Sequence, residues 1–549
     1  MKHGTRRART RSTSAAVGAA VVALVATQTS TNAAANPTQG PTTAKTVSQV
    51  AAPVPTLTWH PCFKDALECA RVQVPLDYDD PAGETTGIFM SKHAATDPTH
   101  RIGTLFLNPG GPGGPSSQFV EDFSKLIGAE VAARFDIIGI DPRGIGRSSP
   151  VECRPSRPNP RFPRNYVPLD RNQAKPLIRF NTWLSDSCAQ DANEILHHMT
   201  TADTARDMDL IRQAVGDPKL TYYGVSYGTY LGATYAAMFP TRVRALVLDS
   251  VLDPVAWSRG RGNAGHRLPF STRLRSGVGA WDALVSAFAE CDRVGRVRCP
   301  LAGQASDQWR QIIHRLRQGP AQVSGGTIVY SDVVSGALGA LYARGAYRFL
   351  MRQIHLLHRE LFGRQRPHLA SHDLVAAFRT LARTRPGPYA DVQPARSAQR
   401  ARSFSPTLEG VACADSVNPS NPFAWVRAGA IADRMGPWFG RVWTWFTGPC
   451  ATWPQTGDDA FRGPWKVHPS SPVLLIANFH DPATPIRGAR VLNTLLAGSR
   501  LLSLDTWGHG AIGQSACVTA RMSSYFVTGS LPPEGSVCQP DKELFPVRG

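Results

Sequence analysis

Six short apolar runs are spaced along the chain, and most end in a polar or glycine-rich loop. They cover residues 102–107, 135–140, 220–223, 245–248, 473–477 and 501–504. Short runs rich in β-branched residues are typical of buried parallel strands. Between the second and third runs, Met208, Ile211 and Val215 share one helical face after a capping-box-like start at Thr200 and Asp203. The pattern predicts an α/β fold with a mostly parallel central sheet flanked by helices.

The regular alternation of predicted strands and helices stops between residues 255 and about 455. This stretch is rich in Arg and Gly, with helical segments predicted at 281–291 and 347–361 and a polar, proline-punctuated loop at 364–406. A chain of 549 residues is too long for one ordinary core. We therefore predict a large, mainly helical cap over 255–455, inserted between two halves of the sheet at 56–254 and 456–549.

The N-terminus has the pattern of an export signal. Five Lys and Arg residues precede a short apolar run at 15–26, and small residues follow at 33–35. This predicts a signal peptide over 1–35 and a flexible leader over 36–55. The apolar run is too short to span a bilayer stably, so we expect a secreted, extracellular protein without stable membrane insertion.

The ten cysteines suit an exported chain. An even count suggests disulfides, and the absence of any Cys-x-x-Cys pair in the sequence argues against a structural zinc site. The sequence does not fix the connectivity. Pairing chain neighbours suggests Cys62–Cys69, Cys153–Cys188, Cys291–Cys299, Cys413–Cys450 and Cys517–Cys538.

The chain is basic, with a formal net charge of +19. Its arginines are scattered, and they form no basic stripe interleaved with aromatic residues, so we expect no nucleic-acid partner. An exported protein of this charge could at most associate weakly with anionic cell-wall polymers.

Residues 224–228 read Gly-Val-Ser-Tyr-Gly and fit the G-x-S-x-G nucleophile elbow. In this motif the glycines permit a tight turn from a strand into a helix, which presents the serine hydroxyl. The third apolar run precedes Ser226, and a helix-like segment with small residues follows it. This context favours a nucleophile over an ordinary glycine turn with a passive serine.

A serine nucleophile needs a base, and the base needs an acid that orients it. In the elbow fold the chain order is Ser, acid, His. Asp481 follows the fifth apolar run and His509 follows the sixth, so both lie at the same edge of the sheet as Ser226. His480 and Asp505 are rival assignments, but the spacing from the strand ends favours Asp481 and His509.

A glycine-rich loop, Asn-Pro-Gly-Gly-Pro-Gly-Gly, follows the first run at 108–114. Such a backbone can approach a substrate closely, so the N–H groups of Gly111 and Tyr227 are candidate oxyanion-hole donors. The loop lacks the Lys-Ser/Thr ending of a phosphate-binding loop. We expect neither a metal nor a cofactor, because a triad hydrolase needs none.

From about Trp59 to its end, the chain resembles the secreted actinobacterial tripeptidyl aminopeptidases, serine peptidases of the α/β-hydrolase fold related to prolyl aminopeptidases. The resemblance rests on the Gly-Gly-Pro-Gly loop, Asp-x-Arg-Gly-x-Gly-x-Ser, Gly-x-Ser-Tyr-Gly-Thr, Asp-Pro-x-Thr-Pro and Gly-His-Gly. Cys413-Ala414-Asp415 and the Cys-x-x-Trp-Pro element at 450–454 match two further family elements, and they support the Cys413–Cys450 pairing. Asn108-Pro109 replaces the His-Gly opening of many prolyl aminopeptidases, which favours the tripeptidyl branch.

The resemblance implies a secreted serine exopeptidase that cleaves peptides near free N-termini, releasing tripeptides through an acyl-enzyme on Ser226. The substrate ammonium would need an anionic partner. Candidates are Asp415, Glu121 and Glu290. A secreted esterase or other acyl hydrolase with the same triad is the alternative. A third hypothesis, a surface binding protein with a relic triad, predicts no reaction with a fluorophosphonate.

Overall fold

The computed structural model describes residues 52–64, 66–363, 373–383, 403–454, 457 and 459–547. The predicted signal peptide and the leader up to residue 51 lie outside the described residues, as do 364–372 and 384–402 within the predicted polar loop. The loop prediction is wrong for the part between these gaps. Helix α12 (Leu374–Ala382) lies there, because Leu374, Phe378 and Leu381 bury one apolar face.

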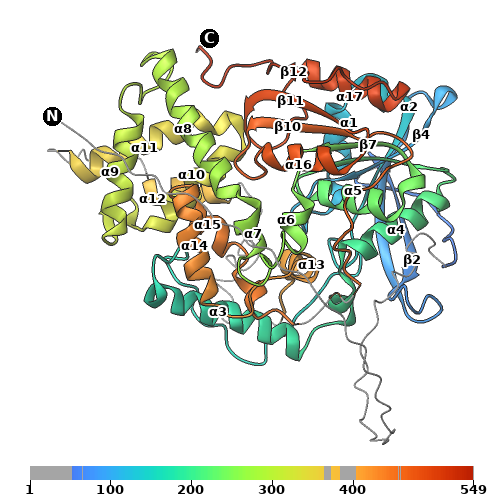
Figure 1. Cartoon of the computed structure of the whole chain (residues 1–549), viewed down its shortest axis with the longest axis horizontal. Helices are drawn as coiled ribbons and strands as arrows, with labels where there is room; N and C mark the ends of the chain where they lie inside the picture. The colour runs from blue at the N-terminus through green and yellow to red at the C-terminus, as the bar shows by residue number, and fades with distance from the viewer. Residues whose placement is uncertain are drawn as a thin grey trace, which may run out of the picture. The chain divides into compact units, whose positions relative to one another are not determined.

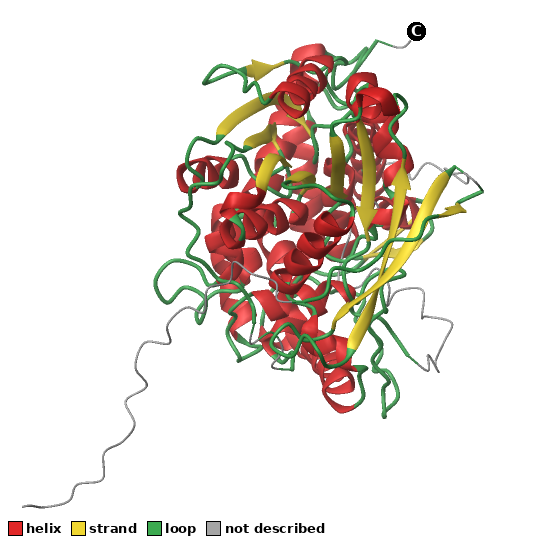
Figure 2. Cartoon of the chain, turned by 90° about the vertical axis from the view of Figure 1, so that its right-hand side faces the viewer, coloured by secondary structure: helices red, strands yellow, loops and turns green. Residues whose placement is uncertain are grey.

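In the described part of the chain, ten strands form one sheet, in the order β1-β2-β3-β5-β4-β6-β7-β10-β11-β12. Along this order, each neighbouring pair of strands from β5 to β12 is parallel. The pairs β1–β2, β2–β3 and β3–β5 are antiparallel. Figure 2 shows the strand direction turning gradually across the sheet. The bounds are β1 (His60–Cys62), β2 (Leu67–Pro75), β3 (Thr85–His93), β4 (Gly103–Asn108), β5 (Phe135–Ile140), β6 (Leu220–Val225), β7 (Val243–Asp249), β10 (Leu474–His480), β11 (Arg500–Trp507) and β12 (Val537–Cys538).

The six apolar runs are strands β4, β5, β6, β7, β10 and β11, so the predicted parallel sheet is confirmed. Both faces of these strands are buried, since successive residues enter different apolar clusters. Phe106 and Tyr222 pack with Met208 on one face. Leu105 and Tyr223 pack on the other. This two-sided burial explains why the strands are continuous apolar runs in the sequence.

Helices cover each face of the sheet. The cluster on one face includes residues of α1 (Val120–Leu126), α2 (Ala129–Arg134) and α17 (Ala516–Thr528). The cluster on the other face includes residues of α3 (Arg171–Gln190), α4 (Thr201–Ala214), α5 (Tyr227–Met238) and α16 (Arg487–Leu495). Helix α4 is the helix predicted after Thr200, whose side chain accepts a hydrogen bond from the Asp203 amide.

In the described ranges, the chain between β7 and β10 is mainly helical. Its helices are α6 (Pro254–Ser258), α7 (Phe270–Leu274), α8 (Ser276–Val294), α9 (Ala305–Arg317), α10 (Tyr330–Tyr342), α11 (Tyr347–Phe362), α12, α13 (Thr407–Asp415), α14 (Ala424–Met435) and α15 (Gly440–Trp445), with a short hairpin of β8 (Ala321–Val323) and β9 (Gly326–Ile328). In Figure 1, α8 to α12, α14 and α15 gather on the left, beside the strands on the right. Here we call this helical segment the cap.

The segment after β12, residues 539–547, crosses from the sheet to the cap, and here we call it the tail. Phe545 is fully buried, and Arg298 of the cap donates a hydrogen bond from Nε to its carbonyl at 2.7 Å. Arg344 of the cap donates to the carbonyl of Lys542 at 2.5 Å. These two hydrogen bonds therefore hold the tail against the cap.

Five disulfides join all ten cysteines, and they are the five pairs of chain neighbours that the sequence suggested. Such a set is typical of proteins in oxidising compartments. None of the helices in the described ranges has the length and apolar character needed to cross a membrane.

Candidate active site

Ser226 lies on a sharp turn between β6 and α5. Its backbone has φ 59° and ψ −121°, a strained conformation for a residue with a side chain. The Ser226 amide donates to the carbonyl of Asp249 at 3.0 Å. A Cβ at Gly224 would lie 2.4 Å from the carbonyl oxygen of Gly228, so the motif needs glycine there. This is the geometry of a nucleophile elbow, and it leaves Ser226 half-buried rather than enclosed.

Asp481 and His509 meet at the same edge of the sheet, directly after β10 and β11. Nδ1 of His509 lies 2.9 Å from each carboxylate oxygen of Asp481. The Asp481 side chain is fully buried, and that of His509 is 10% exposed. Asp481 also accepts hydrogen bonds from the amides of Ala483 and Thr484, both at 2.8 Å, and from the Thr484 hydroxyl at 2.9 Å.

The electrostatics of this pair favour the charged forms of both side chains. Burial opposes ionisation of Asp481, but His509 and the two amides lower the pKa of the carboxyl below its ordinary value. Burial also opposes protonation of His509, but the Asp481 charge raises the imidazole pKa. With Nδ1–H directed at Asp481, Nε2 is the nitrogen that can accept a proton. The arrangement can stabilise an imidazolium during proton transfer.

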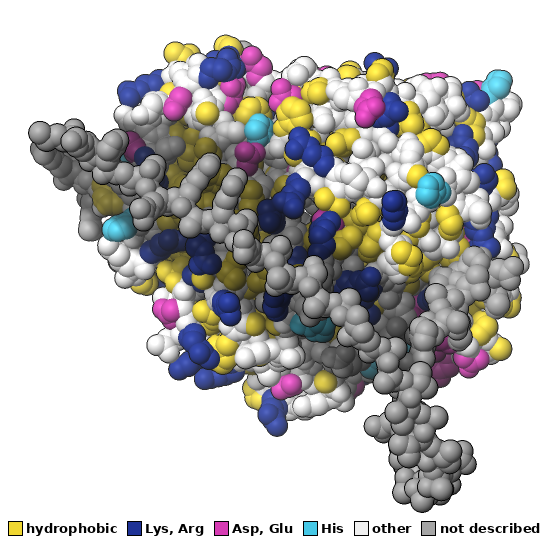
Figure 3. Space-filling model, viewed as in Figure 1, with side chains coloured by type: hydrophobic (Ala, Val, Ile, Leu, Met, Phe, Trp, Pro, Cys, Tyr) yellow, Lys and Arg dark blue, Asp and Glu magenta, His cyan; other side chains and the backbone are white. Residues whose placement is uncertain are grey.

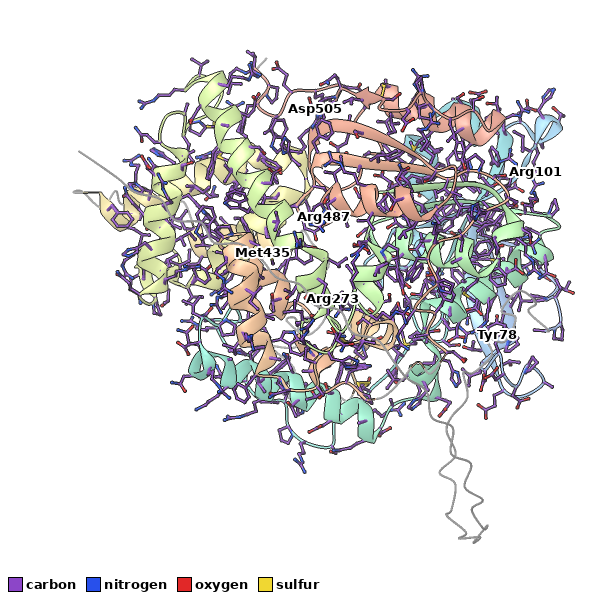
Figure 4. The ribbon with its side chains drawn as sticks, in the orientation of Figure 1. Tyr78, Arg101, Arg273, Met435, Arg487 and Asp505 are labelled. Atoms are coloured by element: carbon purple, nitrogen blue, oxygen red, sulfur yellow. A yellow bond between two sulfur atoms is a disulfide. The ribbon has the colours of Figure 1, made fainter. Side chains whose placement is uncertain are left out.

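The rival residues are engaged elsewhere. His480 pairs through Nδ1 with Asp282 of α8 at 2.7 Å and stacks on Trp507, with ring centroids 4.8 Å apart. Asp505 lies within β11 (Figure 4), where its carboxylate is 3.5 Å from the Gln539 amide nitrogen just after β12. The structure therefore pairs His509 with Asp481 and not with Asp505.

The glycine-rich loop after β4 touches the elbow. A Cβ at Gly110 would lie 2.9 Å from Cβ of Ser226 and 3.0 Å from the amide nitrogen of Tyr227. Only glycine permits this approach, and the Asn108 side chain fixes the loop by accepting from the Gly110 amide at 2.9 Å. Gly111, the predicted donor, is the next residue. The loop thus runs beside the Tyr227 amide, the second predicted donor.

The three candidate anchor acids lie in different surroundings. Glu121 is exposed on α1 and pairs with Lys125 at 2.8 Å. Glu290 on α8 pairs with Arg293 at 2.6 Å. Of the three, Asp415 at the end of α13 is linked to the elbow by hydrogen bonds. Its Oδ2 accepts from the Thr201 hydroxyl at 2.6 Å, and that hydroxyl is 2.5 Å from the phenol oxygen of Tyr227.

Asp415 is buried, with 1% of its surface exposed. Besides the Thr201 hydroxyl, the Thr201 amide donates to it at 2.9 Å and Trp257 Nε1 donates at 3.4 Å. Burial raises the pKa of Asp415 to about 6, although these donors oppose the rise. Asp415 therefore connects the cap to the residue next to Ser226.

Sequence reasoning missed two residues that hold the His509 loop. The carbonyl of Tyr342, at the end of α10, accepts from the His509 amide at 3.0 Å, and the Tyr342 ring meets the imidazole edge-on with centroids 5.1 Å apart. Asp249 at the end of β7 accepts from the amides of Ala511 and Ile512. A polar residue ending an apolar run was the available signal for Asp249. Tyr342 carries no motif.

Lys and Arg side chains gather across the middle of the face in Figure 3. Arg273 and Arg487 are labelled in Figure 4. Arg273 is structural, because it donates to backbone carbonyls that include those of Ala256 and Val417, both at 2.8 Å. Burial lowers the pKa of Arg273 to about 9. Arg487 is exposed at the start of α16, a few residues after Asp481.

In the described ranges, no group of three or more His, Cys, Asp or Glu residues could hold a metal ion.

The sheet topology and the elbow define the class of protein, a serine hydrolase with the α/β-hydrolase fold. Residues 103–274 match the family model described as "alpha/beta hydrolase fold", and residues 436–538 match the model described as "TAP-like protein".

Similar proteins show to which family of this class the chain belongs. The chain is 30% identical to "Tripeptidyl aminopeptidase" of Streptomyces coelicolor, over 88% of this chain and 86% of that protein. It is 30% identical to "Serine protease Hip1" of Mycobacterium tuberculosis, over 87% and 90%. It is 31% identical to "Carboxylesterase B" of the same species, over 89% and 91%. The chain belongs to the tripeptidyl aminopeptidase family of α/β-hydrolases, as its motifs predicted.

Proposed function

We propose that the protein is a secreted serine exopeptidase that cleaves peptides near free N-termini and releases tripeptides. The observation that carries the proposal is the Asp481–His509 pair at 2.9 Å, at the sheet edge where Ser226 occupies a strained elbow. The relatives named as a tripeptidyl aminopeptidase and a serine protease support peptides as the substrate class.

In the proposed reaction, Ser226 attacks the carbonyl carbon of the scissile bond while Nε2 of His509 takes its proton. The amides of Gly111 and Tyr227 stabilise the oxyanion, and His509 then protonates the leaving amine. Water releases the acyl group by the reverse sequence. Asp481 holds the imidazole tautomer and stabilises its charged form throughout.

The position of the cap supports the proposal that cleavage occurs near chain ends. Helix α13 packs against the glycine-rich loop, since a Cβ at Gly113 would lie 2.6 Å from Oγ1 of Thr407. Tyr342 of the cap packs against His509. Cap elements thus lie beside both the proposed oxyanion loop and the proposed base. This arrangement favours a short chain end as the substrate over a segment in the middle of a folded protein.

Among the candidate acids, we propose Asp415 as the one best placed to influence the substrate ammonium. Its carboxylate already accepts from Thr201 twice, so an ammonium would compete with the long 3.4 Å bond from Trp257. Glu121 and Glu290 have Lys and Arg partners of their own. The proposed secretion is supported by the five disulfides and by the N-terminal sequence pattern.

The test is to incubate the purified protein with matched free and N-acetylated peptides and to read the products by mass spectrometry, with Ser226→Ala as the control. Tripeptides released only from free N-termini, and lost in the variant, are the expected result. Equal cleavage of acetylated peptides would contradict the exopeptidase proposal.

The second candidate function is an esterase, which the relative named carboxylesterase B favours. Parallel assays with a peptide anilide and a simple ester separate the two functions. Hydrolysis of the ester alone through Ser226 would select the esterase.

A further inference from the structure

Asp249 lies between the proposed nucleophile and the proposed base and contacts the chain segments that carry both. Its backbone carbonyl accepts the Ser226 amide at 3.0 Å. Its buried carboxylate accepts the amides of Ala511, at 2.8 Å to Oδ2, and of Ile512, at 3.2 Å. The loop that carries His509 is therefore fixed to the same residue as the elbow that carries Ser226.

The neighbouring Ser250 extends this arrangement. Its hydroxyl accepts the Gly510 amide at 2.8 Å, and its backbone has a positive φ of 57°. Three consecutive amides after His509, those of residues 510 to 512, therefore donate to the Asp249-Ser250 dipeptide. A rigid support of this kind matters because a displacement of about 1 Å in a reacting group costs about 100-fold in rate.

We propose that Asp249 is a positioning residue that couples the Ser226 elbow to the His509 loop and sets the spacing of nucleophile and base. The inference rests on the proposed function of Ser226 and His509. It adds a buried carboxylate, besides Asp481, on which the proposed reaction depends. Asp249 does not contact the reacting atoms, so it acts only through the backbone and charge that it supplies.

The groups that contact the Asp249 carboxylate are hydrogen-bond donors. The Tyr223 phenol donates to Oδ2 of Asp249 at 2.7 Å, and the amides of Ala511 and Ile512 donate to the same carboxylate. An ionised carboxylate satisfies them, whereas an amide would direct its own N–H groups at some of them. Burial raises the pKa of Asp249 above its ordinary value, while the Tyr223 hydroxyl, the amides and the charge of His509 oppose this rise.

The Asp249 charge also acts on the base. Groups that face His509 are Asp481, the Thr484 hydroxyl at 3.4 Å from Nδ1, the Tyr342 ring and, at longer range, Asp249. Both carboxylates raise the pKa of His509. Loss of the Asp249 charge should therefore move the acid limb of the activity profile to lower pH. A purely structural residue would not produce this shift.

The experiment compares Asp249→Asn with Tyr223→Phe, which removes one donor to the carboxylate and leaves the charge and the amide contacts. The rate of reaction of Ser226 with a fluorophosphonate is measured from about pH 5 to about pH 8, around the ordinary histidine pKa. This probe needs Ser226 and His509 but no peptide specificity. Asp249→Asn should react about 100-fold more slowly, with its acid limb at lower pH, and Tyr223→Phe should stay within about threefold of the wild type.

If the wild type itself does not react at Ser226, the proposed function fails. If the wild type reacts and Asp249→Asn matches it in rate and pH profile, the coupling role fails while the proposed function stands. If Asp249→Asn does not fold, Ser250→Ala tests the same support. It removes only the acceptor for the Gly510 amide, and it should slow the reaction by about tenfold. An unchanged rate in that variant would overturn the proposal.

Discussion

Asp415 is predicted to make the protein less stable as the pH rises. Its pKa is raised from an ordinary 3.8 to about 6 by burial, so the folded protein holds this proton over a range where the unfolded chain has lost it. The stability that the protonated carboxyl supplies is complete below the unfolded pKa and is lost as the pH rises through the folded pKa. Each pH unit of this interval is worth about 1.4 kcal/mol, which gives a loss of about 3 kcal/mol by neutral pH.

The substitution Asp415→Asn removes the titration and keeps an acceptor for Thr201. Urea unfolding of both proteins, with disulfides intact, gives the free energy of unfolding at about pH 4 and about pH 7.5. The variant should gain about 2–3 kcal/mol on the wild type between these two pH values. Glu121→Gln, a change at an exposed ion pair, is the control and should gain almost nothing. A stability difference that stays constant with pH for Asp415→Asn would refute this reasoning.

Three further predictions test other parts of the structure. Asp481→Asn should lower kcat on a peptide anilide by about 10⁴-fold with little change in KM, because His509 loses the carboxylate that fixes its tautomer. A loss of kcat under about tenfold would contradict that role of Asp481. Asp207→Ala should lower the free energy of unfolding by about 3–5 kcal/mol in thermal unfolding, because it leaves the fully buried Arg143 guanidinium without its bidentate partner. Replacing both residues with apolar ones should recover much of this loss. Phe545→Ala should cost about 3–5 kcal/mol, because this ring is fully buried in an apolar cluster and its carbonyl is bonded to Arg298 of the cap. Val547→Ala, at a side chain that is 69% exposed, should change little, and equal losses would contradict the role of the tail.

The sequence predicted the parts of the fold that depend on buried, continuous segments. Strands β4 and β6 are apolar on both faces, so their positions and the polar residues after them are visible as runs followed by loops. Strand β2 alternates buried and exposed residues at its antiparallel edge, and it carries no such signal. Helix α12 is short and lies in a polar, proline-rich context, so its apolar face was missed.

The candidate site was predictable where a local motif carries the chemistry. Ser226, Asp481 and His509 each follow a strand end, and the parallel topology brings these ends to one edge. Contacts between distant segments were not predictable in this way. Tyr342 is far from His509 in the sequence, and only the folded cap brings them together. Asp415 is one of the three acids that the sequence offers as substrate anchors, but its burial and its bonds to Thr201 depend on how α13 packs on the core.

The central claim, that Ser226 is the nucleophile activated by His509, is tested most directly by covalent labelling. The purified protein is treated with a fluorophosphonate, digested and mapped by mass spectrometry, beside Ser226→Ala and His509→Ala. The account predicts one adduct on the peptide that contains Ser226, absent from Ser226→Ala and formed far more slowly in His509→Ala. An adduct on another serine, or no adduct in the folded wild type, would contradict it.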